Sequence, residues 1–332
     1  MTFKDQIVKI KRRKYPEKFA EITTKPHMLQ LLPYLLYSIY KGTGYRKNLL
    51  RSFRINRIPL YSTTSEQLVS PPVIELIINS ERKDFRNLSE VITYAITNSV
   101  NPVGKTTVAV PYSQLSECRE VLSGISNKYG IEVLSEDLFL TDSIREKLRS
   151  TFGKRYGWAL QQFLTIDRVL KSDYKGVLQV NSDTILLRPT QWLDSEGRQP
   201  ILVSTEYHRP YYVFLHNLNM EFPVLTDSHI THHMLFQPQV FRDILHKSNV
   251  KSLEKLVDFT VTNAQIYENS PFCVEFELYA LGALRYFPEK ITLAKFGNIN
   301  HPRRPHVNSI EFQSELQELA KKYNSISAHS YL

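Results

Sequence analysis

The fold expected for this chain follows from one stretch, Val177-Leu178-Gln179-Val180-Asn181-Ser182-Asp183-Thr184-Ile185-Leu186-Leu187-Arg188-Pro189. An apolar run is followed by a short polar tripeptide, and a second apolar run then ends at Arg188-Pro189. This pattern predicts a buried strand whose carboxyl end, at the tripeptide, is exposed. Because ligands of open α/β sheets bind at the carboxyl ends of strands, the stretch also predicts a binding edge there.

Asp183 is the charged residue of this strand end. Hard cations such as Mg²⁺ and Mn²⁺ take oxygen ligands and commonly bridge a protein carboxylate to a substrate diphosphate. Asp183 is therefore a candidate metal ligand. The alternative is that it caps a strand or turn, as polar residues at strand ends often do.

Strand and helix patterns alternate from Val73 onward, which predicts an α/β fold with a mainly parallel sheet and crossover helices. Acidic Ser135-Glu136-Asp137 follows the third strand, and an aromatic-rich loop at 207–212 is a candidate wall of an acceptor groove or a packed loop. We expect strands at 73–78, 107–110, 131–134, 201–204 and 291–296, and helices at 88–97, 113–128, 143–149, 158–170 and 311–322.

Charge divides the chain into two parts. Residues 1–57 hold 14 Lys and Arg against 3 Asp and Glu, a net +11. Since the whole chain carries +9, the remainder carries −2. Ser70-Pro71-Pro72 is typical of a linker. We therefore predict a basic, mostly helical N-terminal arm at 1–70 and an α/β domain at 71–332.

The basic arm has three interpretations. Its apolar, aromatic stretch at 29–40, beside basic residues, suits a segment that lies on an anionic membrane surface. It also suits a helical pair packed against the main domain with a solvated basic face. The same composition permits nucleic-acid binding, but no nucleic-acid motif is visible, which counts against that partner.

Cysteine content and the N-terminal residues bear on the compartment. Cys118 and Cys273 form neither a disulfide framework nor a metal-ligand spacing, as expected in a reducing compartment. The chain has no run of about 18 apolar residues and no apolar signal core after Met1. We expect a cytoplasmic protein, peripheral at the inner face of the membrane if the arm binds lipid.

Five motifs follow one another along roughly residues 72–332. As a set they resemble a group of bacterial glycosyltransferase-like proteins with the GT-A (Rossmann-like) fold. The resemblance implies transfer of a sugar from a nucleotide-sugar, for which we expect a UDP-sugar, to a glycan or lipid-linked acceptor. The motifs are Gly157-Trp158-Ala159-Leu160-Gln161-Gln162, Asn181-Ser182-Asp183 before Arg188-Pro189, His232-His233-Met234, Glu275-Phe276-Glu277-Leu278-Tyr279 and His329-Ser330-Tyr331.

The resemblance implies a donor site on the first strand end and on the Gly-Trp helix. In GT-A proteins the first strand and its following loop hold the nucleotide base and ribose. Arg303 and Arg304, in a basic loop stiffened by prolines, would neutralise a diphosphate. The other candidates for contact with the donor are Asn79, Ser80, Arg82, Trp158, Gln161, Gln162, Asn181 and Ser182.

The resemblance also implies a metal site. Asp183 would ligate Mn²⁺ or Mg²⁺, His329 would supply another ligand, and the ion would act as a Lewis acid on the leaving diphosphate. Asn181 stands where the family pattern more often has aspartate. This departure removes one charge and leaves open a weaker site, or a metal-independent one that relies on Arg303 and Arg304.

Three residues are candidates for chemistry at the acceptor. Adjacent histidines on a helix point in different directions, so His232 is expected to hydrogen-bond a sugar hydroxyl or phosphate rather than to share a metal with its neighbour. In GT-A enzymes a carboxylate near Glu275 and Glu277 contacts acceptor hydroxyls or acts as a base. Carboxylates two residues apart do not share a helix face, and we favour Glu275. Alternatively, both are helix-start carboxylates stabilised by the helix dipole.

Two other functions remain open at this stage. One is a non-catalytic nucleotide-sugar- or glycan-binding protein on the same fold, with the basic arm as its targeting element. The other is a nucleotidyltransferase, which shares the fold and the metal chemistry. That class normally has a glycine-rich, basic first loop, and residues 79–82 do not resemble one.

Overall fold

The part of the chain that the structure, a computed structural model, describes excludes most of the basic arm. Arg303, Arg304 and His329 also lie outside it. No helix within this part is both long enough and apolar enough to cross a bilayer. The described residues are 55, 57–60, 70–204, 209–218, 220, 227–248, 250–266, 275–300 and 310–328.

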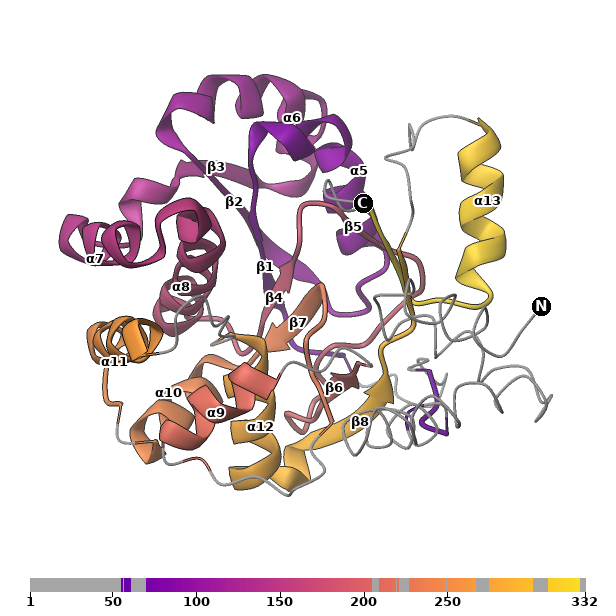
Figure 1. The fold of residues 1–332 in the computed structure, drawn as a ribbon. Coiled ribbons are helices and arrows are strands. Elements are labelled where there is room, and N and C mark those ends of the chain that lie inside the picture. Colours follow the sequence, from indigo (N-terminus) through magenta and orange to yellow (C-terminus); the bar gives the residue numbers. More distant parts are fainter. Residues whose placement is uncertain are drawn as a thin grey trace, which may run out of the picture.

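A central sheet organises the described residues (Figure 1). Its strand order is β3-β2-β1-β4-β7, and every neighbouring pair is parallel except β4 and β7, which are antiparallel. The prediction of an α/β fold with a mainly parallel sheet flanked by helices is confirmed. The strands are β1 (Ile74–Asn79), β2 (Val103–Val110), β3 (Ile131–Ser135), β4 (Val177–Val180) and β7 (His233–Phe236).

Helices cover both faces of this sheet, and Figure 1 shows α5 and α8 on opposite sides of β1. One face carries α5 (Leu88–Thr97) and α6 (Leu115–Tyr129). α6 ends at Gly130, whose left-handed backbone (φ 57°) favours glycine. The other face carries α7 (Asp142–Phe152), α8 (Tyr156–Lys171), α10 (Pro238–Lys247), α11 (Leu253–Ile266) and α12 (Phe276–Tyr286).

The two faces build two hydrophobic cores. Because successive residues of a strand point to opposite faces, Ile77 packs with α8 while Leu76 and Ile78 pack with α5. Neighbouring strands repeat the pattern, with Val177 on the α8 face and Leu178 on the α5 face. β1 and β4 therefore read as continuous apolar runs, as expected of strands covered on both sides.

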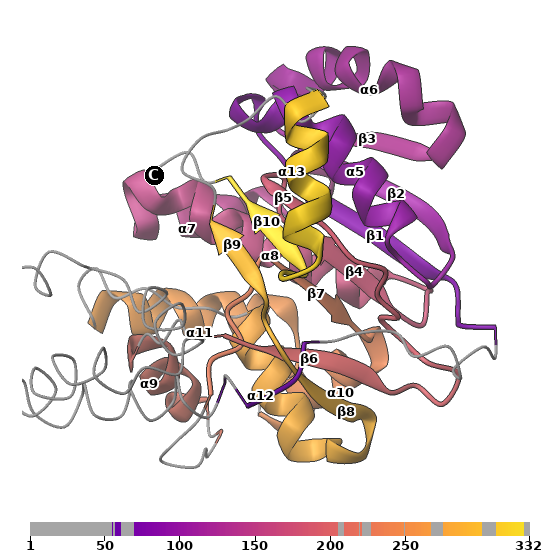
Figure 2. The same ribbon diagram turned by 90° about the vertical axis from the view of Figure 1, so that its right-hand side faces the viewer.

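Two smaller sheets lie beside the central one. In the first, β10 (Ser325–Ser327) pairs antiparallel with β5 (Thr184–Leu186) and parallel with β9 (Asn298–Asn300). Figure 2 shows α13 (Ile310–Ala320) in front of this sheet, where Leu316 and Ile326 share a core. This pairing returns the C-terminal segment to the turn that follows β4.

The second small sheet pairs β6 (Gln199–Val203) with β8 (Ile291–Lys295), in parallel. The described end of the predicted arm contacts this sheet. The Lys295 N–H donates to the Pro59 carbonyl at 2.9 Å, and Leu60 forms a parallel β-bridge with Lys295. A Cβ at Gly297 would lie 2.3 Å from Leu60 Cδ2, so glycine makes this approach possible.

Three local predictions need correction. The His232-His233 segment leads into strand β7 and not into a helix. The short run His233–Phe236 is buried throughout and pairs antiparallel with β4 as the edge strand of the central sheet. The aromatic stretch expected as a loop becomes helix α9 from Arg209 (Arg209–Asn217). The apolar stretch resumed at Thr184 joins a different sheet from the one that β4 belongs to.

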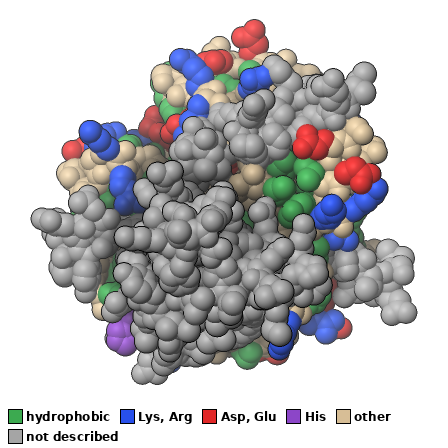
Figure 3. All heavy atoms as spheres, turned by 45° about the vertical axis from the view of Figure 1, so that its right-hand side comes forward, with side chains coloured by type: hydrophobic (Ala, Val, Ile, Leu, Met, Phe, Trp, Pro, Cys, Tyr) green, Lys and Arg blue, Asp and Glu red, His purple; other side chains and the backbone are tan. Residues whose placement is uncertain are grey.

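Surface charge is mixed on the face drawn in Figure 3. Side chains of both signs stand near one another on its described surface, and no large area there is basic alone. This fits the near-neutral charge expected for residues beyond the basic arm.

Candidate functional site

A cleft of about 720 Å³ opens at the carboxyl ends of β1 to β4. Its wall also includes the N-terminal half of α8, the segment that enters β7 and the start of α12. This is the sheet edge at which the sequence predicts ligand binding. The predicted site residues that line the cleft are Asn79, Ser80, Trp158, Gln161, Gln162, Asn181, Ser182, Asp183, His232 and Glu275.

The tripeptide after β4 forms a tight turn, in which the Thr184 N–H donates to the Asn181 carbonyl at 3.0 Å. The Asn181 N–H donates in turn to the His232 carbonyl at 2.9 Å. Its side-chain oxygen accepts from Gln179 Nε2 at 2.9 Å, and its Nδ2 lies 3.5 Å from His232 Nδ1. Asn181 therefore fixes His232 on the cleft wall.

Asp183 is half-buried in the cleft wall. Its Oδ1 accepts from Thr184 Oγ1 at 3.3 Å, and its carbonyl accepts from the Ala328 N–H at 2.9 Å. Ala328 is the last residue that the structure describes, and His329 follows it directly in the sequence. Among the described residues, no group of three His, Cys, Asp or Glu side chains is arranged to hold a metal.

Asp84 is a second carboxylate in the cleft that was not among the residues predicted from the sequence. It belongs to a short helix (Arg82–Asn87) after β1, is buried, and accepts from Ser182 Oγ at 2.7 Å. No pattern in the sequence links Asp84 to Ser182, because 98 residues separate them.

α8 is tied to the end of β1. Asn79 Nδ2 donates to Thr165 Oγ1 at 2.9 Å and to the Gln161 carbonyl at 3.2 Å. Buried Arg168 donates to Asn79 Oδ1 at 3.3 Å and to the Thr107 carbonyl at 2.8 Å. Burial lowers the pKa of Arg168 to about 10, so the guanidinium still carries its charge at neutral pH. These bonds hold the N-terminal half of α8 against the cleft.

Three buried polar atoms in the cleft wall have no hydrogen-bond partner among the described residues. They are Ser80 Oγ on β1, Gln179 Oε1 on β4 and Glu275 Oε2 before α12. A buried polar atom destabilises the fold unless a partner satisfies it, so such atoms mark where water or a hydroxylated ligand binds.

Glu275 is 8% exposed and stands at the first turn of α12. Burial raises the pKa of its carboxyl to about 8, so the group is mostly neutral at pH 7. A neutral carboxyl donates a hydrogen bond as well as accepting one. Glu275 therefore has the state and the location to exchange a proton with a ligand hydroxyl.

Two predicted side chains do not line the cleft. Glu277 is fully buried beneath it and accepts from Ser228 Oγ at 2.8 Å and from the His229 N–H at 3.0 Å. The helical period turns it away from Glu275. Arg82 pairs with Glu117 at the surface, with Nε and Oε2 2.6 Å apart, because the first turn after β1 faces α6.

The two adjacent histidines have different environments. Alternation on a strand sends consecutive side chains to opposite faces, so His232 lines the cleft while His233 is buried. Burial lowers the pKa of His233 to about 3, and its ring lies edge-on to Trp192 with centroids 5.4 Å apart. His233 is thus a neutral core residue.

Other ionisable residues line the cleft outside the predicted donor and metal sites. Glu136 belongs to the acidic run after the third strand, and Tyr211 on α9 belongs to the aromatic stretch that was expected to form a wall of an acceptor groove or a packed loop. No sequence pattern indicated Lys83, Lys154 or Tyr156.

Searches with the sequence found no matching family model and no matching curated protein. Comparison of the fold found solved glycosyltransferases. Mouse xyloside xylosyltransferase 1 in its apo form has 9% sequence identity and a TM-score of 0.44, covering 78% of this chain and 99% of its own. The galactosyltransferase LgtC with donor and acceptor sugar analogues has 8% identity and a TM-score of 0.44, covering 76% and 86%.

An active-site mutant of LgtC gives a TM-score of 0.47 at 9% identity, with the same coverage of 76% and 86%. All three scores are below 0.5, so the similarity carries no argument about activity. The α/β description of this chain rests on its own sheet order and helix layers.

Proposed function

We propose that the chain is a glycosyltransferase that moves a sugar from a UDP-sugar to a glycan or lipid-linked acceptor. The observation that carries this proposal is the cleft at the carboxyl edge of the sheet. It gathers Asp183, His232 and Glu275 from three separate segments, beside the unsatisfied hydroxyl of Ser80. The five motifs that resemble GT-A glycosyltransferases supply most of these residues, which supports the same reaction.

The donor diphosphate is proposed to lie by Asp183, with the nucleoside extending over the ends of β1 and β2. Ser80 Oγ and Gln179 Oε1 are buried in this wall without partners among the described residues, so donor hydroxyl and phosphate groups would satisfy them. The amides of Gln161 and Gln162 and the ring of Trp158 line the same wall. Arg303 and Arg304 are proposed to neutralise the diphosphate and lie outside the described residues.

A divalent cation fits the donor set in part. The carboxylates of Asp183 and Asp84 offer the oxygen atoms that Mg²⁺ and Mn²⁺ prefer. Ser182, which precedes Asp183 in the turn after β4, donates a hydrogen bond to Asp84 and so connects the two. His329 is proposed as a further ligand, because it directly follows Ala328, whose N–H donates a hydrogen bond to the Asp183 carbonyl. A bound ion would stabilise negative charge on the departing diphosphate as a Lewis acid.

Glu275 is proposed to contact the acceptor hydroxyl and, in its ionised form, to take its proton. A general base works best when its pKa is near the working pH, and burial brings the pKa of Glu275 to about 8. His232, fixed by Asn181, is proposed to hydrogen-bond a sugar hydroxyl or phosphate.

The acceptor and location form part of the same proposal. A net charge of +11 on residues 1–57 would attract an anionic lipid surface. This would hold a cytoplasmic enzyme at the inner face of a membrane, next to a lipid-linked acceptor.

The test is a thermal-shift screen of UDP-, GDP-, CMP- and dTDP-sugars with and without Mn²⁺, followed by a transfer assay with the sugar that binds. We expect a UDP-sugar to raise the melting temperature, and Mn²⁺ to increase the shift. Asp183→Asn should remove the Mn²⁺-dependent part and lower turnover about 10²-fold or more, the usual cost of losing a group that stabilises transition-state charge.

Asp243→Asn on α10, outside the cleft, is the matched control and should behave as the parent chain. A normal metal response in Asp183→Asn would contradict the donor model. Binding without turnover of any nucleotide-sugar would instead favour a non-catalytic nucleotide-sugar-binding protein.

A further inference from the structure

Glu136 lies at the end of the cleft away from Asp183. It follows β3, the strand at the far edge of the sheet, and lines the cleft with Pro111, Lys154 and Tyr156. The side chain is half-buried. Its carboxyl makes no hydrogen bond or ion pair with any residue that the structure describes. A polar group built into a cleft wall in this way has its hydrogen-bonding capacity available for a ligand.

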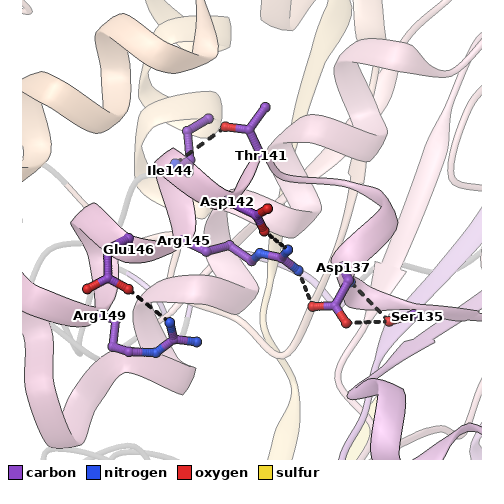
Figure 4. A network of polar contacts seen from close by, with 8 residues as sticks. All are labelled: Ser135, Asp137, Thr141, Asp142, Ile144, Arg145, Glu146 and Arg149. Atoms are coloured by element: carbon purple, nitrogen blue, oxygen red, sulfur yellow. Dashed lines mark hydrogen bonds and ion pairs between the residues drawn. The ribbon is translucent and has the colours of Figure 1, made fainter.

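The two arginines whose charges lower the pKa of Glu136 form ion pairs with other carboxylates (Figure 4). Arg145 is held between Asp137 and Asp142, as the dashed lines show. Arg149 pairs with Glu146, with Nη1 and Oε2 3.1 Å apart. Because other carboxylates hold both guanidinium groups, neither one neutralises Glu136 through an ion pair.

The surroundings favour the neutral form of this carboxyl. Burial raises its pKa to about 7, and the nearby charges of Asp137 and Glu81 act in the same direction. Arg145 and Arg149 on α7 lower it by less. Lys83, Lys154 and Tyr156 also line the cleft, and the positive charges of the two lysines would favour the ionised carboxyl. The negative charge of a bound diphosphate would act in the opposite direction and favour the neutral form.

The length of the cleft relates Glu136 to a nucleotide. Three strand spacings separate β4 from β3, which amounts to about 14 Å. An extended nucleoside diphosphate is comparable in length. With its diphosphate beside Asp183, such a molecule would cross β1 and β2 and bring the hydrogen-bonding edge of its base to Glu136.

We propose that Glu136 recognises the base of the bound nucleotide as a neutral carboxyl, donating its O–H to O4 of uracil and accepting N3–H. This rests on the proposed function and names the residue that contacts the base of the donor. An ionised carboxylate only accepts hydrogen bonds, so it would meet O4 of uracil without a donor, and the paired contact requires the proton. The contact of Glu136 with uracil is therefore strongest at acidic pH.

The experiment measures the affinity of UDP and of GDP by calorimetry at pH 6 and pH 8.5, with the parent chain and Glu136→Gln. The parent should bind UDP about tenfold more tightly at pH 6, since deprotonation of Glu136 removes the donor. Glu136→Gln should bind UDP tightly at both pH values, because an amide offers the same donor and acceptor at any pH.

Ionisation of UDP itself affects both proteins equally, so the difference between them isolates Glu136. Identical pH profiles would overturn the inference and leave the proposed function standing. So would GDP binding that exceeds UDP binding and strengthens with pH, which would mean that an ionised carboxylate reads guanine. A UDP affinity that rises with pH and is lost in Glu136→Gln would point to a ribose hydroxyl and also overturn it. No binding of either nucleotide to either folded protein would overturn the proposed function as well.

Discussion

Glu275 and Glu277 are two residues apart, yet their surroundings give the two carboxyls different roles. Glu275 has an oxygen with no partner among the described residues and lines the cleft, and its pKa rises to about 8. Glu277 accepts hydrogen bonds from Ser228, His229 and Tyr212 and lies outside the cleft wall. The two carboxyls therefore differ in the three donors that Glu277 Oε1 accepts from and in the place of Glu275 on the cleft wall, and not in burial.

At the residue scale we predict that Glu275→Gln stabilises the fold while it reduces transfer about 10²-fold or more. The carboxyl has a pKa of 4.5 when exposed and about 8 in the folded chain. Between these pH values the unfolded chain is ionised and the folded chain is not, so folding stability decreases as pH rises. The gain in melting temperature from Gln should therefore be larger at pH 8 than at pH 5, as differential scanning fluorimetry would reveal.

Glu277→Gln is the matched comparison and should lower the melting temperature at every pH tested. It weakens hydrogen bonds that three donors make to a buried carboxylate, a loss of about 1–3 kcal/mol. If both substitutions destabilise the chain to the same extent, the distinction between the two carboxyls is incorrect.

At the scale of elements, close packing between helices sets which substitutions the chain tolerates. α10 and α12 approach each other at Gly282, where a Cβ would lie 2.5 Å from Ile244 Cγ2 and 2.9 Å from two further atoms of that side chain. All of Ile244 is buried, so it has little room to move. The contact supports the helix layer that carries Glu275 at its edge.

We predict that Gly282→Ala destabilises the chain by about 1–3 kcal/mol, the usual effect of overpacking a core. Gly124→Ala on α6 is the control, because nothing lies within 4 Å of its added Cβ. Alanine there should stabilise the helix by up to about 1 kcal/mol. Urea unfolding of both variants gives the comparison, and equal effects of the two substitutions would contradict the close approach of α10 and α12.

On the scale of the whole molecule, segments distant in sequence meet around the central sheet. The C-terminal strand β10 pairs with β5 and leads the chain to Asp183, 145 residues away in sequence from Ala328. The end of the N-terminal arm contacts β8 through Pro59 and Leu60. Ile55, just before this contact, is 1% exposed.

We therefore predict that Ile55→Ala in the full chain lowers stability by about 2–5 kcal/mol, as expected when a large buried side chain is truncated. Leu138→Ala is the control, since this leucine is 69% exposed and its truncation should change stability little. Thermal unfolding of the two variants decides the point. A melting temperature unaffected by Ile55→Ala would show that this end of the arm does not contribute to the folded domain.

The alternation of strands and helices, and the sheet edge that carries the cleft, could be predicted from the amino-acid sequence. These follow from local hydrophobic periodicity, which is why the helix expected at 88–97 coincides with α5 and the strand before Asn181 with β4. The turn at Asp183 was also visible, because polar residues interrupt an otherwise apolar run.

The side chains that meet in the cleft became known only from the folded chain. Asp84 reaches Ser182, His233 is buried while His232 faces the cleft, and Glu136 comes to its far end. Glu277 and Arg82, selected from sequence motifs, turn instead to other partners. The physical reason is that pairing across 50 to 100 residues, burial and the pKa values that burial sets depend on packed neighbours, which local sequence patterns do not specify.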